Sequence, residues 1–152
     1  PSGLADPVSG AYRFATGWHL AASLGRVDAA LADIERYQDW WPQVREIQRL
    51  DSATGRVRVR SLLPYSLDLV LARDVEDEAG GILRVDLTGD LCGWCAWHLT
   101  PESTGTRALF SQEVEVEAPL LQRVPLAVRP LLRGNHAFMM RSGERGLRRY
   151  LA

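Results

Sequence analysis

The sequence predicts an α+β fold in which a first strand and two short helices precede a series of antiparallel strands and a long C-terminal helix. Three observations support this prediction. Residues 12–22 alternate with period 2, residues 27–41 place apolar side chains at helical spacing, and residues 121–150 return to helical spacing. With 152 residues, 46% of them apolar, the chain has the length and composition of a single domain with a sizeable core.

The composition argues against several classes of function. The 19 acidic and 18 basic residues give a net charge of −1, without the basic excess of a protein that binds nucleic acid. All the basic residues are arginine, so the chain offers no lysine for a Schiff base or a P-loop. No apolar run reaches the roughly 18 residues of a membrane-spanning helix, and we expect no integral membrane association. Residues 1–10 lack the regions of a signal peptide, which favours a cytoplasmic location.

The first strand and the helical segment meet at Ser23. Before it, one side of the alternation is apolar, as in a strand with one buried face. After it, the apolar side chains follow helical spacing: Val27, Ala30, Leu31, Ile34, Tyr37 and Trp41. We expect two short helices, or one bent helix, that end at Trp40-Trp41-Pro42 because proline interrupts helical hydrogen bonding.

The middle of the chain is rich in strand patterns separated by turn residues. The expected strands are 44–50, 56–63, 66–77, 82–90, 91–99 and 106–117. Asp51–Gly55 has turn chemistry, and Gly80-Gly81 predicts a tight hairpin. In the last of these strands Ala108, Phe110 and Gln112 share one side, and the other side is charged and expected to face water.

The final segment predicts a long helix. Its apolar stripe contains Leu121, Val124, Val128, Leu132, Asn135, Met139, Gly143 and Leu147. Pro125 and Pro130 should bend this helix or delay its start.

The two cysteines form a Cys-Gly-Trp-Cys motif at Cys92 and Cys95. Such spacing suggests a redox pair or half of a zinc site. However, the segment is typical of a strand, where residues three apart point to opposite faces and lie about 10 Å apart. That separation is too large for a disulfide, so we interpret both cysteines as small strand residues.

Several of these segments together resemble one family. The first strand leads into the helical residues 27–42, followed later by Leu-Thr-Gly-Asp-Leu-x-Gly at 87–93, Trp-x-Leu-x-Pro at 97–101 and Gly105-Thr106. With the long C-terminal helix, this resembles the polyketide cyclase/dehydrase branch of the START-like superfamily, also called SRPBCC or Bet v 1-like. The resemblance implies a helix-grip fold, a curved antiparallel sheet wrapped around the C-terminal helix with an apolar cavity between them.

The same resemblance implies a simple domain organisation. Residues 1–10 are expected to be a flexible N-terminal segment, and residues 11–152 a single START-like helix-grip domain. The superfamily includes cyclases, lipid carriers and hormone receptors, so it does not by itself define the chemistry.

Three residues are candidates for catalysis. Arg73 shares strand parity with Leu69 and Leu71 and would polarise a ligand carbonyl; alternatively it reaches solvent or pairs with an acid. His136 is the one histidine placed to exchange a proton with a bound molecule, or it packs at the margin of the helix. Tyr65 follows Pro64 at a strand entry and would contribute a hydroxyl at the cavity rim.

The candidate ligand-binding residues share the inward side of a strand or helix. Gln112 and Asn135 are neutral groups that would hydrogen-bond a ligand or, alternatively, are satisfied core residues. Trp41 would stack on a planar ligand or anchor the helix. The full set is Trp41, Leu69, Leu71, Trp97, Phe110, Gln112, Leu132, Asn135 and Met139.

Two main functions follow from these expectations. The first is the binding of a hydrophobic, aromatic, polycyclic or lipid-like small molecule by an aromatase/cyclase or dehydratase that uses no cofactor. The alternative is a carrier or sensor of a lipid, quinone or aromatic metabolite without turnover. A third hypothesis is a partner-binding protein with a filled pocket. No metal site, nucleophile or dinucleotide motif is expected, and the protein would be a monomer or homodimer.

Overall fold

The computed structural model describes residues 11–60, 66–77, 79–116 and 131–152. In these residues the chain forms seven strands, two α-helices and one 3₁₀ helix, η2. The elements are β1 (Ala11–Leu20), α1 (Leu24–Ala32), η2 (Ile34–Asp39), β2 (Val44–Arg49), β3 (Thr54–Val59), β4 (Leu67–Asp77), β5 (Ile82–Gly89), β6 (Leu91–Glu102), β7 (Gly105–Val116) and α3 (Leu131–Leu151).

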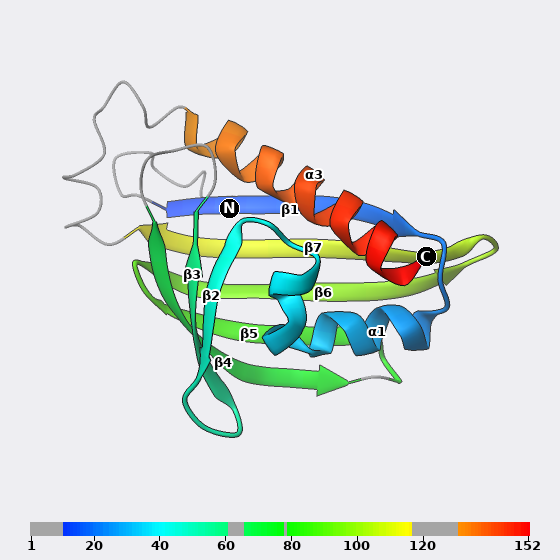
Figure 1. The fold of residues 1–152 in the computed structure, drawn as a ribbon, viewed down its shortest axis with the longest axis horizontal. Coiled ribbons are helices and arrows are strands. Elements are labelled where there is room, and N and C mark those ends of the chain that lie inside the picture. Colours follow the sequence, from blue (N-terminus) through cyan, green and yellow to red (C-terminus); the bar gives the residue numbers. More distant parts are fainter. Residues whose placement is uncertain (1–10, 61–65, 78, 117–130) are drawn as a thin grey trace, which may run out of the picture.

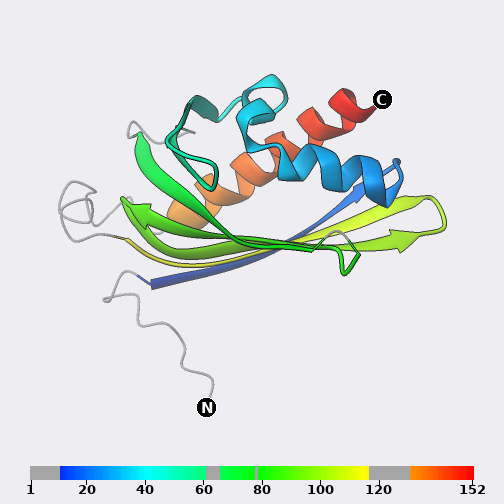
Figure 2. The same ribbon diagram turned by 90° about the horizontal axis from the view of Figure 1, so that it is seen from below.

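The strands form one antiparallel sheet in the order β1-β7-β6-β5-β4-β3-β2 (Figure 1). The first strand therefore pairs with the last, and the other neighbours are consecutive in the chain. All three helices lie on the same face of the curved sheet (Figure 2). α3 crosses that face diagonally, while α1 and η2 cover the part that α3 leaves open (Figure 1).

The predicted fold class is confirmed, including the two short helices after the first strand and the long C-terminal helix. Three local details differ from the expectation, the first being that β3 begins inside the predicted turn, at Thr54. The second short helix is a 3₁₀ helix, and β6 continues through Pro101, which pairs with Thr106 next to the hairpin turn. The described part of α3 begins at Leu131, directly after Pro130, and the predicted helical positions 121–128 lie outside the described residues.

One end of the interface between sheet and helix is closed by an aromatic corner, which consists of Trp18, Trp40 and Trp41. Their rings lie 5.2 to 6.3 Å apart, and each is at least 94% buried. Gly143 and Gly146 of α3 pack directly onto them. A Cβ on Gly143 would lie 2.6 Å from the Trp41 ring, and one on Gly146 would overlap the Trp40 carbonyl oxygen. The absence of side chains there lets α3 approach closely.

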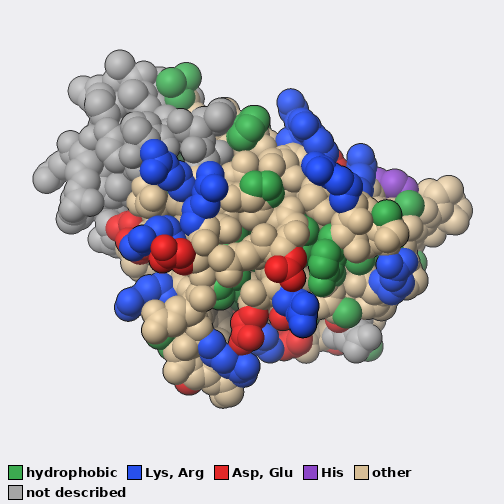
Figure 3. Space-filling view, viewed as in Figure 1, with side chains coloured by type: hydrophobic (Ala, Val, Ile, Leu, Met, Phe, Trp, Pro, Cys, Tyr) green, Lys and Arg blue, Asp and Glu red, His purple; other side chains and the backbone are tan. Residues whose placement is uncertain are grey.

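The opposite face of the sheet is largely polar, and several of its charged side chains pair across strands. Arg13 of β1 contacts Glu113 of β7 at 3.3 Å, and Arg58 of β3 contacts Asp68 of β4 at 2.9 Å. The surface seen in Figure 3, on the helix side, also mixes basic and acidic side chains. This distribution agrees with a net charge close to zero. Among the described residues, no helix has both the length and the hydropathy that crossing a membrane requires.

Candidate functional site

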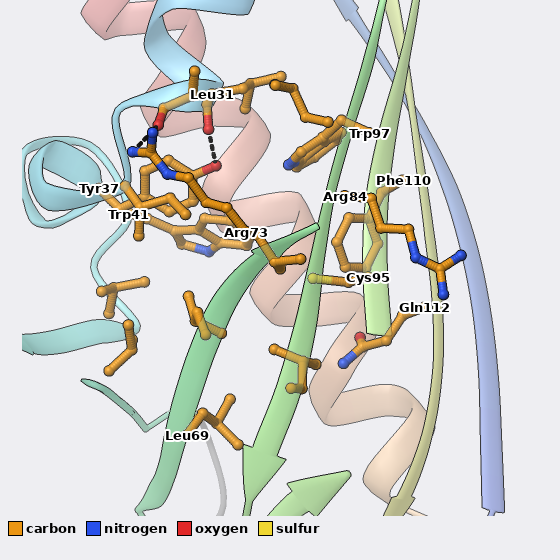
Figure 4. Close-up of a pocket in the computed structure, with 18 of the residues that line it drawn as sticks. Leu31, Tyr37, Trp41, Leu69, Arg73, Arg84, Cys95, Trp97, Phe110 and Gln112 are labelled. Atoms are coloured by element: carbon orange, nitrogen blue, oxygen red, sulfur yellow. Dashed lines mark hydrogen bonds between the residues drawn. The ribbon is translucent and has the colours of Figure 1, made fainter. Parts of the chain in front are cut away.

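A cavity of about 140 Å³ lies between the sheet and the helices, next to the aromatic corner. On the same measure a single buried water needs roughly 10–15 Å³, so the cavity is large enough for an organic molecule. Side chains from β2 to β7, from all three helices and from the segment after η2 line it (Figure 4). The aliphatic part of this wall comes from Leu31, Ile34, Val44, Val57, Val59, Leu69, Leu71, Val75, Leu83, Val85, Leu87 and Met139.

Side-chain size explains why this half of the interface stays open. Three of the strands that face the cavity, β3 to β5, present mainly valine and leucine, which are short side chains for the distance to the helices across a curved sheet. At the aromatic corner three tryptophans fill the equivalent space. The cavity therefore forms because small and large side chains are unevenly distributed along one apolar face of the sheet.

Arg73 lies at the mouth of the cavity, where β4 approaches α1. Its side chain is 45% exposed and makes an ion pair with Glu76 at 3.2 Å. Its other terminal nitrogen donates to the Ala32 carbonyl at 3.4 Å, at the C-terminal end of α1 (Figure 4). The helix dipole favours a cation at this position. A register shift in β4 between Arg73 and Val75 is the local irregularity that accompanies this arrangement.

Tyr37 of η2 lies on the wall near the mouth. Its hydroxyl donates to the Leu31 carbonyl at 2.6 Å. Burial raises its pKa well above the usual range. Figure 4 shows the indole nitrogen of Trp97 on the side facing Tyr37. Because burial penalises its charged form, Tyr37 stays protonated near neutral pH, and its hydroxyl is bonded to the backbone.

Elsewhere on the cavity wall, Gln112 of β7 pairs with His136 of α3, which lies behind it. Gln112 lines the cavity and is 9% exposed, and the His136 Nε2–H donates to its Oε1 at 2.9 Å. The imidazole stacks on Phe14, with ring centres 3.8 Å apart and planes within 13°. Burial, with a smaller effect of the Arg133 charge, lowers the pKa of His136 to about 4. The imidazole is therefore neutral at pH 7.

The two cysteines lie on opposite faces of β6, as their spacing predicts, and both are free thiols. Cys95 lines the cavity between Trp97 and Gln112 (Figure 4). Burial raises the pKa of its thiol to about 12, so it remains protonated and unreactive at neutral pH. Within the described ranges, no group of three or more histidine, cysteine or acidic side chains is arranged to hold a metal ion.

The structure gathers most of the candidate binding residues around the cavity. Those that line it are Trp41, Leu69, Leu71, Trp97, Phe110, Gln112 and Met139. Leu132 and Asn135 lie earlier on α3 and are not among the lining residues. Of the catalytic candidates, Arg73 lies at the mouth, His136 lies behind Gln112, and Tyr65 lies outside the described residues.

Sequence reasoning missed part of the wall. Leu83, Val85 and Leu87 share one side of β5, and the alternation of that strand contained the signal needed to find them. Cys95 was interpreted only as a small strand residue, although its parity with Trp97 places both on the inner face. Tyr37 belongs to the apolar stripe predicted for the helical segment, and its hydroxyl contact with the Leu31 carbonyl has no local sequence signal.

The comparison with solved structures identifies the fold. The Zhui aromatase/cyclase from Streptomyces has a TM-score of 0.77 at 14% identity, with 93% of each chain covered. A START superfamily protein from Mycobacterium smegmatis has a TM-score of 0.70 at 17% identity, covering 93% of this chain and 96% of that one. The chain has a START-like fold.

A third structural neighbour is the di-domain aromatase/cyclase StfQ of the steffimycin biosynthetic pathway. It has a TM-score of 0.63 at 11% identity, with 92% of this chain and 51% of that chain covered. No protein-family model and no curated protein matches the sequence. At these identities the likeness establishes the START-like fold, and the function has to be argued from the cavity itself.

Proposed function

We propose that this protein binds a hydrophobic small molecule, aromatic or polycyclic, in the cavity between the sheet and the helices. The observation that supports this most directly is the cavity itself, which is lined mostly by aliphatic and aromatic side chains. Trp41, Trp97 and Phe110 present ring surfaces to it, and such surfaces stack well on a planar ligand. A cavity of this kind, with few polar groups, is the usual form of a small-molecule site.

A non-catalytic carrier or sensor is the function that the side chains support best. The Tyr37 proton is held by the Leu31 carbonyl, and the Nε2 proton of His136 by Gln112. Both groups favour their neutral forms because burial penalises their charged forms. The wall therefore offers shape and hydrogen bonding more readily than proton transfer.

The test is direct binding combined with a cavity-filling variant. Native mass spectrometry of the purified protein should reveal a retained apolar ligand, or uptake of 9-fluorenone from a panel of aromatic and acyl compounds. Cys95→Phe places a ring inside the cavity and should weaken fluorenone binding at least about tenfold. Cys92→Phe makes the same change on the other face of β6 and should leave binding intact. If the wild-type protein takes up no compound of the panel, the proposal is wrong.

The second candidate is a polyketide aromatase/cyclase or dehydratase. The observation that favours it is Arg73, a cation at the mouth of a cavity in a fold shared with the Zhui aromatase/cyclase. Arg73 would polarise a carbonyl of a poly-β-ketone chain while the cavity holds the chain folded for ring closure. His136 would act on a proton only after it releases Gln112.

This candidate is tested by turnover. A poly-β-ketone thioester mimic is incubated with the protein, and aromatic products are followed by absorbance and mass spectrometry. Under the cyclase hypothesis Arg73→Gln should lose turnover and keep binding of the mimic. Binding of the mimic without any aromatic product from the wild-type protein would leave the carrier role as the function.

A further inference from the structure

Gln112 is a polar side chain in an otherwise apolar part of the cavity wall, and its orientation is fixed. The glutamine is nine-tenths buried, and its amide oxygen accepts from His136 Nε2–H at 2.9 Å. A contact between Nε2 and an amide oxygen requires the proton on Nε2, whichever charge the ring has. In this arrangement, with the proton on Nε2, the amide oxygen of Gln112 faces the histidine.

The histidine is itself held in place. Its ring stacks on Phe14 of β1, nearly parallel and 3.8 Å away, and a second aromatic ring, Phe110, lies 6.0 Å from it. Rotation of the imidazole out of its plane would break the stack, and while the proton is on Nε2 a reversed Gln112 amide would place its N–H donors against that proton. Within the described part of the chain, the Gln112 amide nitrogen has no hydrogen-bond acceptor.

We infer that His136 locks Gln112 as a hydrogen-bond donor to the cavity, so that the ligand is an apolar molecule with a carbonyl-type acceptor, such as a ketone or quinone. A hydrocarbon of the same shape leaves buried N–H groups without a partner, and that penalty disfavours it. The inference rests on the proposed function, because it concerns a ligand of the same cavity. It adds the chemical class of that ligand and gives His136 the part of a positioning residue.

The experiment compares two rigid molecules that differ by one carbonyl oxygen, 9-fluorenone and fluorene. Dissociation constants are measured by quenching of tryptophan fluorescence. The wild-type protein should bind fluorenone about tenfold more tightly than fluorene. Gln112→Leu keeps the volume, removes the donor, and should abolish the preference without loss of fluorene binding.

The role of His136 is tested separately. His136→Phe preserves a ring against Phe14 and removes the Nε2 donor, so the amide is free to turn and the preference should fall to less than about threefold. His136→Gln supplies a new amide donor and should restore part of the preference. His98→Phe makes the same substitution at an exposed histidine on the outer face of β6 and should change nothing.

The outcomes separate the two proposals. Equal affinity of the wild-type protein for both molecules overturns the inference and leaves the binding function in place. If His136→Phe keeps the full preference for fluorenone over fluorene, His136 does not position the Gln112 amide. If neither molecule binds and the ligand panel of the previous section also fails, the proposed function itself is wrong. Circular dichroism of each variant establishes that it is folded.

Discussion

The aromatic corner and the cavity are two halves of one interface, and they show opposite uses of the same apolar face. At the aromatic corner the side chains are large, α3 has glycines, and the two surfaces touch. Around the cavity the side chains of β3, β4 and β5 are mainly valine and leucine, and the space between sheet and helices stays open. The aromatic corner stabilises the fold by burial of large side chains, and the other half gives up part of that burial and leaves a cavity.

The two halves also differ in how they treat polar groups. At the aromatic corner the indole nitrogen of Trp41 donates to the Met139 carbonyl of α3 at 3.0 Å, whereas those of Trp18 and Trp40 are buried without a partner among the described residues. The corner is thus held mainly by packing. At the cavity, polar groups are paired with each other, as in Gln112 with His136, or with the backbone, as in Tyr37 with Leu31.

The largest expected effect comes from emptying the filled half. Trp18→Ala removes a side chain that is 1% exposed and contacts three other tryptophans, and it should lower the free energy of unfolding by about 3–5 kcal/mol. Leu71→Ala at the cavity should cost only about 1 kcal/mol, because Leu71 already borders open space. Urea denaturation measures both. An equal loss of unfolding free energy in the two variants would show that the aromatic corner and the cavity do not differ in packing.

The division into two halves also explains what the sequence could reveal. Strand alternation placed Leu69, Leu71, Phe110 and Gln112 on the inner face, and all four line the cavity. The alternation of apolar and polar residues shows only on which face of the sheet a side chain lies. It does not distinguish a residue whose space is filled from one that borders a cavity, because that depends on side chains from distant segments. Arg73 illustrates a further limit, since its contact with Ala32 joins elements far apart in the chain.

The helix shows the same limit in another way. Leu132, Asn135 and Met139 share a stripe, yet only Met139 lines the cavity. A helix of this length spans about 30 Å and crosses the sheet diagonally, so only part of its stripe faces any one site. The fold was predictable because the periodicity of apolar residues and the resemblance to the START-like superfamily are properties of whole segments. The site required the crossing position of α3, which no local pattern contains.

The next effect, in order of size, is a dependence of stability on pH that originates at the cavity. The pKa of His136 is about 4 in the folded protein and about 6.5 when exposed. Between these values the unfolded chain binds the proton more readily, so stability falls as the pH is lowered from about 6.5 to about 4. The loss approaches about 3 kcal/mol at the lower end.

The measurement is urea denaturation at a series of pH values, compared with His136→Phe. Carboxyl groups titrate in both proteins, so the difference between the two profiles isolates the histidine. The variant should lose less stability than the wild-type protein over this range. Parallel profiles would contradict a buried neutral imidazole behind Gln112.

A smaller effect, with a sign that depends on position, is expected from the glycines of α3. Gly146→Ala would press a methyl group onto the Trp40 carbonyl and should destabilise the protein by about 2 kcal/mol. Gly134→Ala is the matched control, because no atom lies within 4 Å of its new Cβ. It should stabilise the helix by up to about 1 kcal/mol. Thermal melting of the two variants should shift in opposite directions, and a common direction would show that close contact at the aromatic corner does not decide the outcome.

The smallest effect on stability should come from the mouth of the cavity. Arg73→Met keeps the apolar stem of the side chain and removes the contacts with Glu76 and Ala32, both of which are exposed or long. Surface ion pairs of this kind contribute less than about 1 kcal/mol, and the unfolding transition should hardly move.

The rate at which a ligand enters should change more than the stability, because the Arg73 guanidinium bridges β4 and the end of α1 across the mouth (Figure 4). Stopped-flow fluorescence with 9-fluorenone should therefore show faster association and faster dissociation, with a similar ratio of the two rates. Unchanged rates would mean that the ligand enters by another route, and a large loss of stability would mean that Arg73 belongs to the packed half of the interface after all.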